Sequence, residues 1–239
     1  MVVVIAAVVV VVMSASGDGG KPIAAAEAVA FIRAVELQPN DLPHGVPYAG
    51  EPGSPPEGAE FQHLLHCGHR GKPRGRTVAA ERSVLADRYR DWIGEVVGSV
   101  VIVMPTEVLA KAEIAALRSR SGRGCMARDL RVSVLGSGGP AAPIYAISLT
   151  SDPFARVLGH DAVVLHLLAR FQRSGRVRSH RRRGAAEQSA KLLYSGEAIF
   201  RVGAADIVFY TVSEHRQFPL SIERHLLTLL YDRANAHKL

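Results

Sequence analysis

Apolar residues recur at helical spacing in three stretches of the chain, which therefore predict helices. Residues 24–37 place Val29, Ile32 and Val35 on one side, so a helix is favoured, although this stretch is also compatible with a strand. Pro105 opens a second helix, because proline is well tolerated at a first helical position. Its expected apolar side holds Val108, Leu109, Ile114 and Leu117. A final helix starts at the predicted N-cap Ser221 and carries an apolar stripe of Ile222, Leu226, Leu229 and Leu230.

Other stretches are rich in β-branched residues and predict strands. Residues 93–104 indicate one or two strands, with a break at Gly98. Residues 144–150 and 161–171 have the same character, and residues 191–202 and 206–212 flank Gly203 as a hairpin. Residues 77–85 are compatible with either a helix or a strand. Strands concentrated late in the chain, without regular βαβ alternation, predict an α+β fold in which helices cover an antiparallel sheet.

Glycine and proline mark the connections between these elements. Residues 44–60 hold four prolines and four glycines and predict an irregular surface loop. One or two helical turns over residues 61–67 precede a basic loop at residues 68–75. A second short helix is expected to hold Cys125, Leu130 and Val134, and residues 136–143 form another loop. Its Gly136-Ser137-Gly138-Gly139 run lacks the Lys-Ser/Thr pair of a phosphate-binding loop, so we interpret it as a turn.

The chain begins with twelve consecutive apolar residues, 2–13. This run has the length of a signal-peptide hydrophobic region and is shorter than the roughly 20 residues that span a bilayer. Ser14 and Ser16 could serve as the small residues before a cleavage site. We therefore expect residues 1–16 to be a signal peptide or membrane anchor, 17–23 a linker and 24–239 one domain. The absence of Lys or Arg before the run indicates that the true start lies upstream.

Positive charge is concentrated in one segment. The formal net charge is +7, and six arginines lie within residues 173–183. They are Arg173, Arg176, Arg178, Arg181, Arg182 and Arg183. Arginines in a Gly/Ser-containing loop can bind phosphate of anionic lipid, cell-wall polymer or nucleic acid. No aromatic residues are interleaved for base stacking, so nucleic acid is the less favoured partner. The simpler interpretation is a solvated, flexible basic loop near residues 173–187.

The chain has two cysteines, Cys67 and Cys125. In an exported protein such an even pair predicts a disulfide, whereas in a cytosolic protein the two would more often be buried thiols. The bridge would close a loop of about 58 residues, for which chain entropy allows roughly 4 kcal/mol.

Several short segments together resemble the exported sensor-type domains and lipoproteins of actinobacteria, a group that includes extracellular domains of some Ser/Thr kinases. The similar segments are Leu37-x-x-x-Asp41-Leu42-Pro43, Cys67-Gly68, residues 99–104 running into the Pro105 helix, and residues 115–118 leading to Cys125, followed by Tyr194, Phe200, Gly203, Asp206-Ile207, Pro219 and the helix ending Arg233-Ala234. The resemblance implies an α+β fold with a concave surface, a structural disulfide and binding of an undefined ligand. It implies no catalytic residues. Lipoprotein members carry a lipidated cysteine after the apolar run, and residues 14–20 contain none.

Candidate catalytic and metal sites are sparse. His63, His66 and His69 surround Cys67 and could bind zinc together with it, but a thiolate ligand cannot also form a disulfide. We therefore favour exposed histidines beside a cystine and expect no metal or other cofactor.

Carboxylates and nucleophiles give no clearer signal. Asp87, Asp91 and Glu95 could line one helical face as paired carboxylates, although a solvated face is the simpler interpretation. No Gly-x-Ser-x-Gly nucleophile elbow is present.

These observations favour an exported or membrane-proximal domain that binds a ligand or a cell-envelope component without catalysis. Two alternatives stay open. One is an exported hydrolase with a dispersed site, and the other is a basic nucleic-acid-binding protein.

Overall fold

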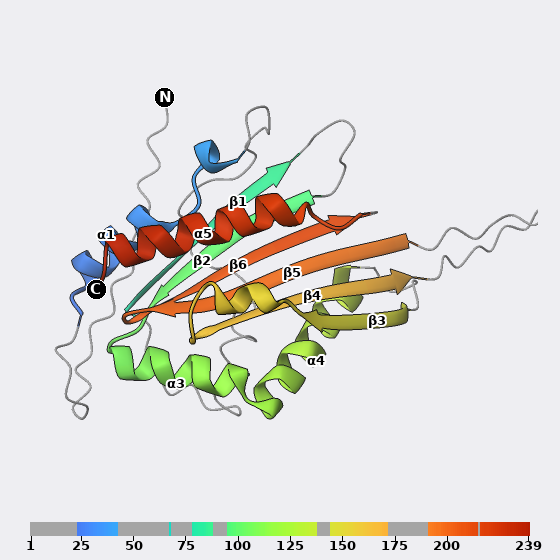
Figure 1. The fold of residues 1–239 in the computed structure, drawn as a ribbon, viewed down its shortest axis with the longest axis horizontal. Coiled ribbons are helices and arrows are strands. Elements are labelled where there is room, and N and C mark those ends of the chain that lie inside the picture. The colour runs from blue at the N-terminus through green and yellow to red at the C-terminus, as the bar shows by residue number, and fades with distance from the viewer. Residues whose placement is uncertain are drawn as a thin grey trace, which may run out of the picture.

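The fold is an antiparallel sheet with helices on both faces (Figure 1). The computed structural model describes residues 23–42, 67, 78–87, 95–137, 144–171, 191–214 and 216–239. The helices are α1 (Ala25–Val35), α3 (Glu107–Arg118), α4 (Arg120–Ser137) and α5 (Leu220–Ala236), with short 3-10 turns η1 (Pro39–Asp41) and η2 (Pro153–Arg156). The strands are β1 (Ala79–Asp87), β2 (Glu95–Val103), β3 (Ile144–Ser151), β4 (Ala162–Phe171), β5 (Lys191–Val202) and β6 (Ala205–Glu214).

All neighbouring strands are antiparallel, in the order β1-β2-β6-β5-β4-β3. This confirms the α+β class. The predicted hairpin is β5–β6, which turns through Gly203 and Ala204 with Gly203 at φ +57°, a conformation that glycine adopts without strain. The connection closes a twelve-residue strand onto a ten-residue one near the centre of the sheet.

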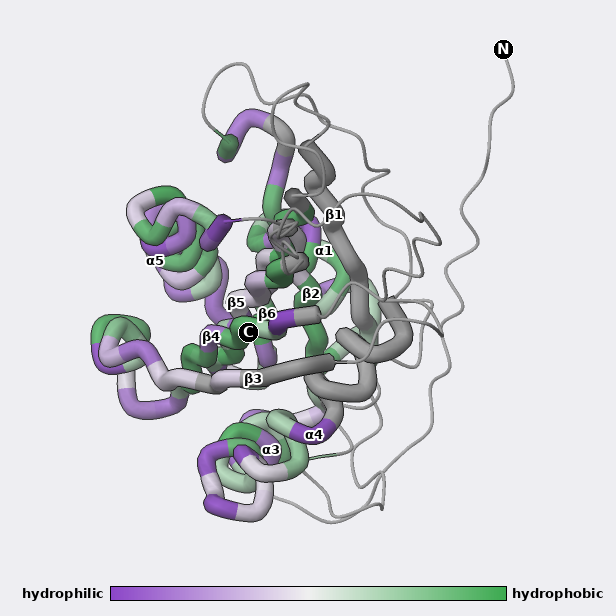
Figure 2. Tube along the Cα trace, turned by 90° about the vertical axis from the view of Figure 1, so that its right-hand side faces the viewer, coloured by the Kyte–Doolittle hydropathy of each residue, from purple (hydrophilic) through white to green (hydrophobic). Residues whose placement is uncertain are grey.

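The sheet separates two hydrophobic clusters. Helices α1 and α5 cover one face, and α3 with the start of α4 covers the other (Figures 1 and 2). Alternation along β5 assigns its side chains: Ala198, Phe200 and Val202 pack under α1 and α5, whereas Ile199 packs toward α3. The face of the sheet to which a side chain points therefore decides which pocket or cluster it can line.

A salt bridge connects the segment after α1 to α5. Arg233 donates from Nη2 to Asp41 Oδ1 at 2.6 Å and from Nη1 to Asp41 Oδ2 at 2.7 Å. The same Asp41 oxygen accepts from the Gln38 backbone N–H, and the Leu37 N–H donates to the buried Ser99 hydroxyl on β2. These contacts hold the segment after α1 against both α5 and β2.

Two sequence predictions about strands need correction. Strand β2 runs without a break through Gly98, because the missing side chain leaves room for the Tyr210 ring of β6. Asp87 and Glu95 do not share a helical face: they end β1 and begin β2, where their Cα positions are register partners. Asp91 lies outside the described residues.

Three predictions about helices also need correction. Helix α5 begins at Leu220, with Pro219 in the N-cap position, so Ser221 lies inside its first turn. Val108 does not join the apolar side of α3 and is 56% exposed, whereas Ile114 and Leu117 are buried. Helix α4 extends to Ser137, so the first part of the predicted 136–143 loop is helical. None of the helices in the described ranges combines the length and apolar character that crossing a bilayer requires.

Candidate functional site

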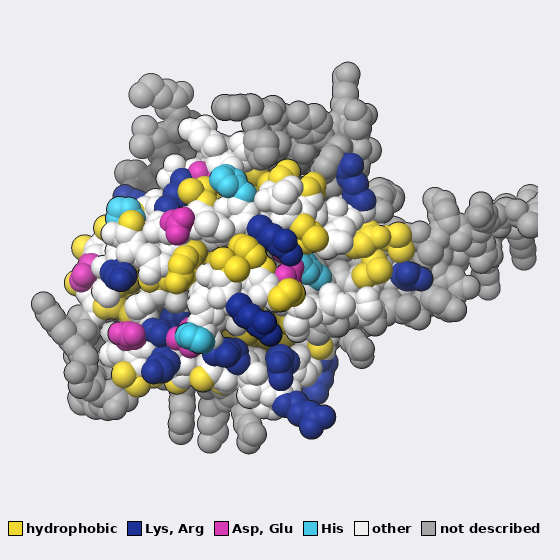
Figure 3. All heavy atoms as spheres, viewed as in Figure 1, with side chains coloured by type: hydrophobic (Ala, Val, Ile, Leu, Met, Phe, Trp, Pro, Cys, Tyr) yellow, Lys and Arg dark blue, Asp and Glu magenta, His cyan; other side chains and the backbone are white. Residues whose placement is uncertain are grey.

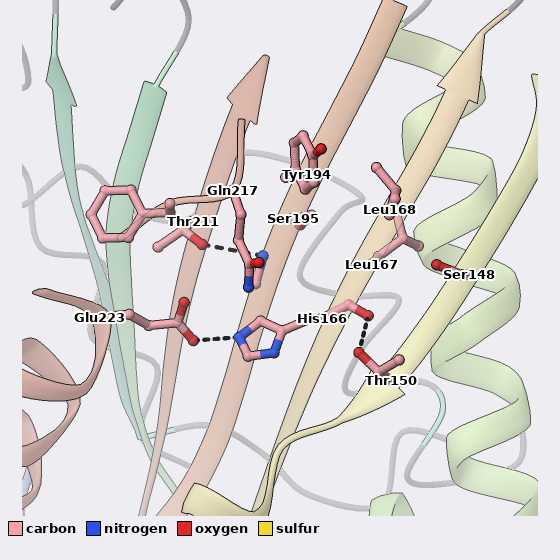
Figure 4. Close-up of a pocket in the computed structure, with 12 residues that line it drawn as sticks. Ser148, Thr150, His166, Leu167, Leu168, Tyr194, Ser195, Thr211, Gln217 and Glu223 are labelled. Carbon is pink, nitrogen blue, oxygen red and sulfur yellow. Dashed lines mark hydrogen bonds and ion pairs between the residues drawn. The ribbon is translucent and has the colours of Figure 1, made fainter. Parts of the chain in front are cut away.

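A pocket of about 200 Å³ opens where β3–β6 meet the start of α5 (Figure 4). A cavity of this size holds several water molecules, so it fits a small ligand. Most lining side chains are polar but uncharged, with two aromatic rings among them. The lining residues are Ser148, Thr150, His166, Leu167, Leu168, Tyr194, Ser195, Gly196, Thr211, Gln217, Phe218 and Glu223.

The only charged side chains in that lining are His166 and Glu223, and they contact each other. Strand β4 directs His166 to the α5 face, and His166 Nε2 lies 2.7 Å from Glu223 Oε1. Glu223 lies in the first turn of α5, where the helix dipole favours a carboxylate. The hydrogen bond to Glu223 raises the pKa of His166, although burial acts in the opposite direction. The pair therefore favours an imidazolium–carboxylate contact.

A second carboxylate faces the other nitrogen of the same ring. Asp152 Oδ2 lies 3.9 Å from His166 Nδ1 and 3.4 Å from Arg224 Nη2. Asp152 Oδ1 also accepts a hydrogen bond from the Phe154 N–H, which fixes the carboxylate at the start of η2. The Arg224 guanidinium lies 5.4 Å from the centroid of the Phe154 ring. Both imidazole nitrogens thus face carboxylates, one in the first turn of α5 and the other at the start of η2.

The base of the pocket requires a glycine. The Gly196 N–H donates to Thr211 Oγ1 at 3.1 Å, which crosses from β5 to β6. A Cβ at Gly196 would overlap that oxygen and would crowd the Glu223 carboxylate and the His166 ring. In Figure 4 the Gln217 side chain extends toward His166 from the segment between β6 and α5. The site therefore combines a rigid sheet base with side chains from the chain that enters α5.

The opposite face of the sheet buries further carboxyl groups. Glu197 is 5% exposed, and burial raises its pKa to about 8. Burial, and then the neighbouring Glu113 carboxyl, raises the pKa of Asp206 well above its usual range. Alternation along the strands points these groups away from the His166 pocket, so they belong to the core under α3.

The predicted site residues have separate outcomes. Cys67 and Cys125 form a disulfide between positions 58 residues apart in the sequence, which confirms the predicted pairing. The six arginines between 173 and 183 lie outside the described residues, as do His63, His66 and His69. Within the described part of the chain, no group of three or more His, Cys, Asp or Glu side chains is arranged to hold a metal.

The pocket residues were missed by the sequence analysis. His166 stands at an inward-facing position in a strand whose other residues, apart from Arg170, are apolar, and this signal could have marked it. Its partners carry no comparable signal, because Glu223 lies 57 residues away and is indistinguishable in sequence from any acidic residue in a first helical turn.

Comparison with known proteins gives no further identification: neither the models of known protein families nor the curated proteins include a match to this chain.

Proposed function

We propose that this protein is an exported or membrane-proximal, sensor-like domain that binds a small, hydroxyl-rich, uncharged ligand in the His166 pocket without chemical conversion. The observation that carries the proposal is the pairing of the charged groups. His166 and Glu223 neutralise each other, which leaves hydroxyl and amide groups such as those of Thr150 and Gln217 to recognise the ligand. A monosaccharide of cell-envelope type has matching hydroxyls and apolar C–H faces for the Phe218 and Tyr194 rings.

The surroundings of His166 favour binding over nucleophilic catalysis. A hydrolytic triad needs one imidazole nitrogen free to accept a proton from a serine or threonine hydroxyl. Here Nε2 contacts Glu223 at 2.7 Å and Nδ1 faces Asp152 at 3.9 Å, and the hydrogen bond to Glu223 raises the pKa of His166, which favours its charged form over a proton acceptor. The Thr150 hydroxyl donates to the backbone carbonyl of His166 and not to its imidazole.

A binding experiment tests the ligand class. N-acetylglucosamine and glucose would be titrated into the full chain while the imidazole signals of His166 are followed by NMR. We expect saturable shifts in the wild type and their loss in Thr150→Trp, which fills the exposed edge of the pocket. Ser151→Trp is the matched control, because Ser151 is the next residue of β3 and is also exposed, but points to the other face. Binding that is equal in the two variants, or absent from the wild type, would contradict the proposed ligand class.

The charge state of His166 gives the first testable prediction. Glu223→Gln should lower the pKa of His166 by more than Asp152→Asn does, because the hydrogen bond from Glu223 is the largest cause of the raised value. The contribution of the pair to the free energy of unfolding is complete below the unfolded pKa of about 6.5, and it is lost as pH rises through the folded pKa. NMR titration of His166 in the three proteins measures this. A pKa of His166 below 6.5 in the wild type would overturn the imidazolium assignment. Covalent labelling of the protein by a serine-hydrolase probe would instead favour the alternative of an exported hydrolase.

A further inference from the structure

Helices α3 and α4 meet in a tight, fixed corner on the face of the molecule opposite the pocket. A single residue, Ser119, joins them: its hydroxyl donates to the Ala116 carbonyl at 2.6 Å and accepts from the Gly122 N–H at 3.0 Å. A Cβ at Gly122 would overlap the Ala116 carbonyl oxygen, so only glycine permits this approach. The disulfide to Cys67 then holds Cys125, one turn further along α4. Side chains on this corner therefore project from a rigid frame.

Five exposed basic residues define what we term the basic corner. They are Lys111, Arg118, Arg120, Arg123 and Arg128. Lys111 and Arg118 are seven residues apart on α3 and share a side. Arg120 and Arg123 are three residues apart and share a side of α4, and Arg128 lies about two turns beyond Arg120. Figure 3 shows Lys and Arg side chains gathered over the junction of the two helices.

The two acidic side chains of α3 do little to neutralise the basic corner. Glu113 is 4% exposed and faces the core, and Glu107 pairs with Arg201 at 3.0 Å. Among the described residues, the one carboxylate within 4 Å of a basic-corner residue is Asp161, which lies 3.7 Å from Arg118. The pKa of Asp161 is lowered chiefly by its hydrogen bond from Arg201, with Arg118 and Lys111 adding to the effect.

We propose that the basic corner docks on the anionic headgroups of a lipid bilayer. Its positive side chains project from a rigid surface into solvent, where lipid phosphate groups can reach them. Val108 is 56% exposed beside this surface and supplies an apolar contact for the interface. A bilayer is also the surface nearest to an exported, membrane-proximal domain, and in this respect alone the inference rests on the proposed function.

A nucleic acid fits these observations less well. Residues 107–137 contain no Phe, Tyr or Trp on which a base could stack. The disulfide that holds α4 is characteristic of oxidising compartments, where lipid headgroups are the more available phosphates.

Vesicle partitioning of the full chain tests the proposal. The partition coefficient would be measured on mixed phosphatidylglycerol–phosphatidylcholine vesicles and on phosphatidylcholine vesicles alone. Each basic side chain near an anionic surface contributes about fivefold, so Arg120→Gln, Arg123→Gln and Arg128→Gln together should lower binding to the anionic vesicles roughly 100-fold. Binding to the neutral vesicles should not change, because these vesicles carry no net negative charge for the arginines to contact.

The matched control removes the same charge elsewhere. Arg33→Gln, Arg156→Gln and Lys238→Gln replace three exposed basic residues away from the basic corner and should change anionic binding only a few-fold. Equal losses in the two triple variants, or equal wild-type binding to the two kinds of vesicle, would overturn the proposal. Tighter binding to duplex DNA than to anionic vesicles at the same salt concentration would reject the lipid in favour of a nucleic acid. The pocket variant Thr150→Trp should bind vesicles as the wild type does, which separates this inference from the proposed ligand.

Discussion

Two titratable side chains of this sheet differ in their charge state. His166 on β4 faces α5 and meets Glu223, so its positive charge has a partner. Glu197 on β5 faces the α3 side, where its Oε2 atom is buried without a hydrogen-bond partner. A buried carboxylate without a partner is costly, and proteins commonly avoid the cost by keeping the group protonated. The face of the sheet to which each side chain points thus determines whether it is charged.

The protonated state of Glu197 predicts an unusual pH dependence of stability. Its pKa is about 8 in the folded protein, compared with the ordinary value of 4.5, so between these values the folded state holds a proton that the unfolded state has released. The free energy of unfolding should therefore fall as pH rises through this range. Glu197→Gln removes this loss and should stabilise the protein on the order of 3 kcal/mol at pH 7.

Urea denaturation at low and high pH measures the effect of Glu197→Gln. The stability difference from wild type should be small near pH 5 and should widen toward pH 8. Glu27→Gln makes the same chemical change on the exposed side of α1 and serves as the control. A difference that does not vary with pH would show that Glu197 is ionised in the folded protein.

At the scale of elements, two glycines of α4 have different roles although both lie in a helix, where glycine is unfavourable. Gly122 lies against the backbone of α3, and its missing side chain is the reason that the corner can close. Gly124 is exposed, and no atom lies within 4 Å of the position where a Cβ would be. Because Gly122 and Gly124 lie two residues apart on one helix, substitutions at the two positions distinguish the effect of packing from that of helix propensity.

Alanine substitutions at the two glycines should change stability in opposite directions. Gly122→Ala forces α4 away from α3 and should lower the free energy of unfolding by about 1–3 kcal/mol. Gly124→Ala should raise it by about 0.5–1 kcal/mol, because alanine restricts the unfolded chain and favours the helix. Chemical denaturation under oxidising conditions compares the two. Destabilisation of equal size in both variants would contradict the close helix contact at Gly122.

On the scale of the whole molecule, two long-range connections fix helices to distant parts of the chain. The Arg233–Asp41 salt bridge joins α5 to the segment after α1, and the Cys67–Cys125 disulfide joins α4 to residue 67. Cys67 is buried in the hydrophobic cluster that also contains Met126 and Ile114. The disulfide therefore stabilises the α3–α4 side of the sheet and not the pocket.

Reduction of the disulfide should lower global stability without removing the pocket. Opening a connection between positions 58 residues apart costs up to about 4 kcal/mol in the chain-entropy model. Denaturation of wild type with and without reductant, compared with Cys67→Ala/Cys125→Ala, measures this loss. The double variant should be insensitive to reductant. Native protein whose thiols react with a thiol reagent before reduction would refute the bridge.

Local pattern determined most of the elements of this protein. The β5–β6 hairpin follows from two apolar runs around Gly203, and α3 follows from Pro105 and the spacing of Ile114 and Leu117, since turns and helical periodicity depend on neighbouring residues alone. The cysteine pairing was predictable because the chain has two cysteines. The predictions were wrong at Gly98, Val108 and Ser221, where a contact with another element or a two-residue shift of the helix start decides the outcome.

The site was decided by tertiary structure. His166, Asp152, Glu223 and Arg224 come from a strand, a 3-10 turn and a helix, and no sequence spacing records that they meet. The basic corner likewise exists because one serine and one glycine fold α3 against α4 and bring separate arginines onto one surface. Periodicity specifies which residues face inward, but which inward-facing charges become partners depends on strand order and helix packing, which only the assembled fold contains.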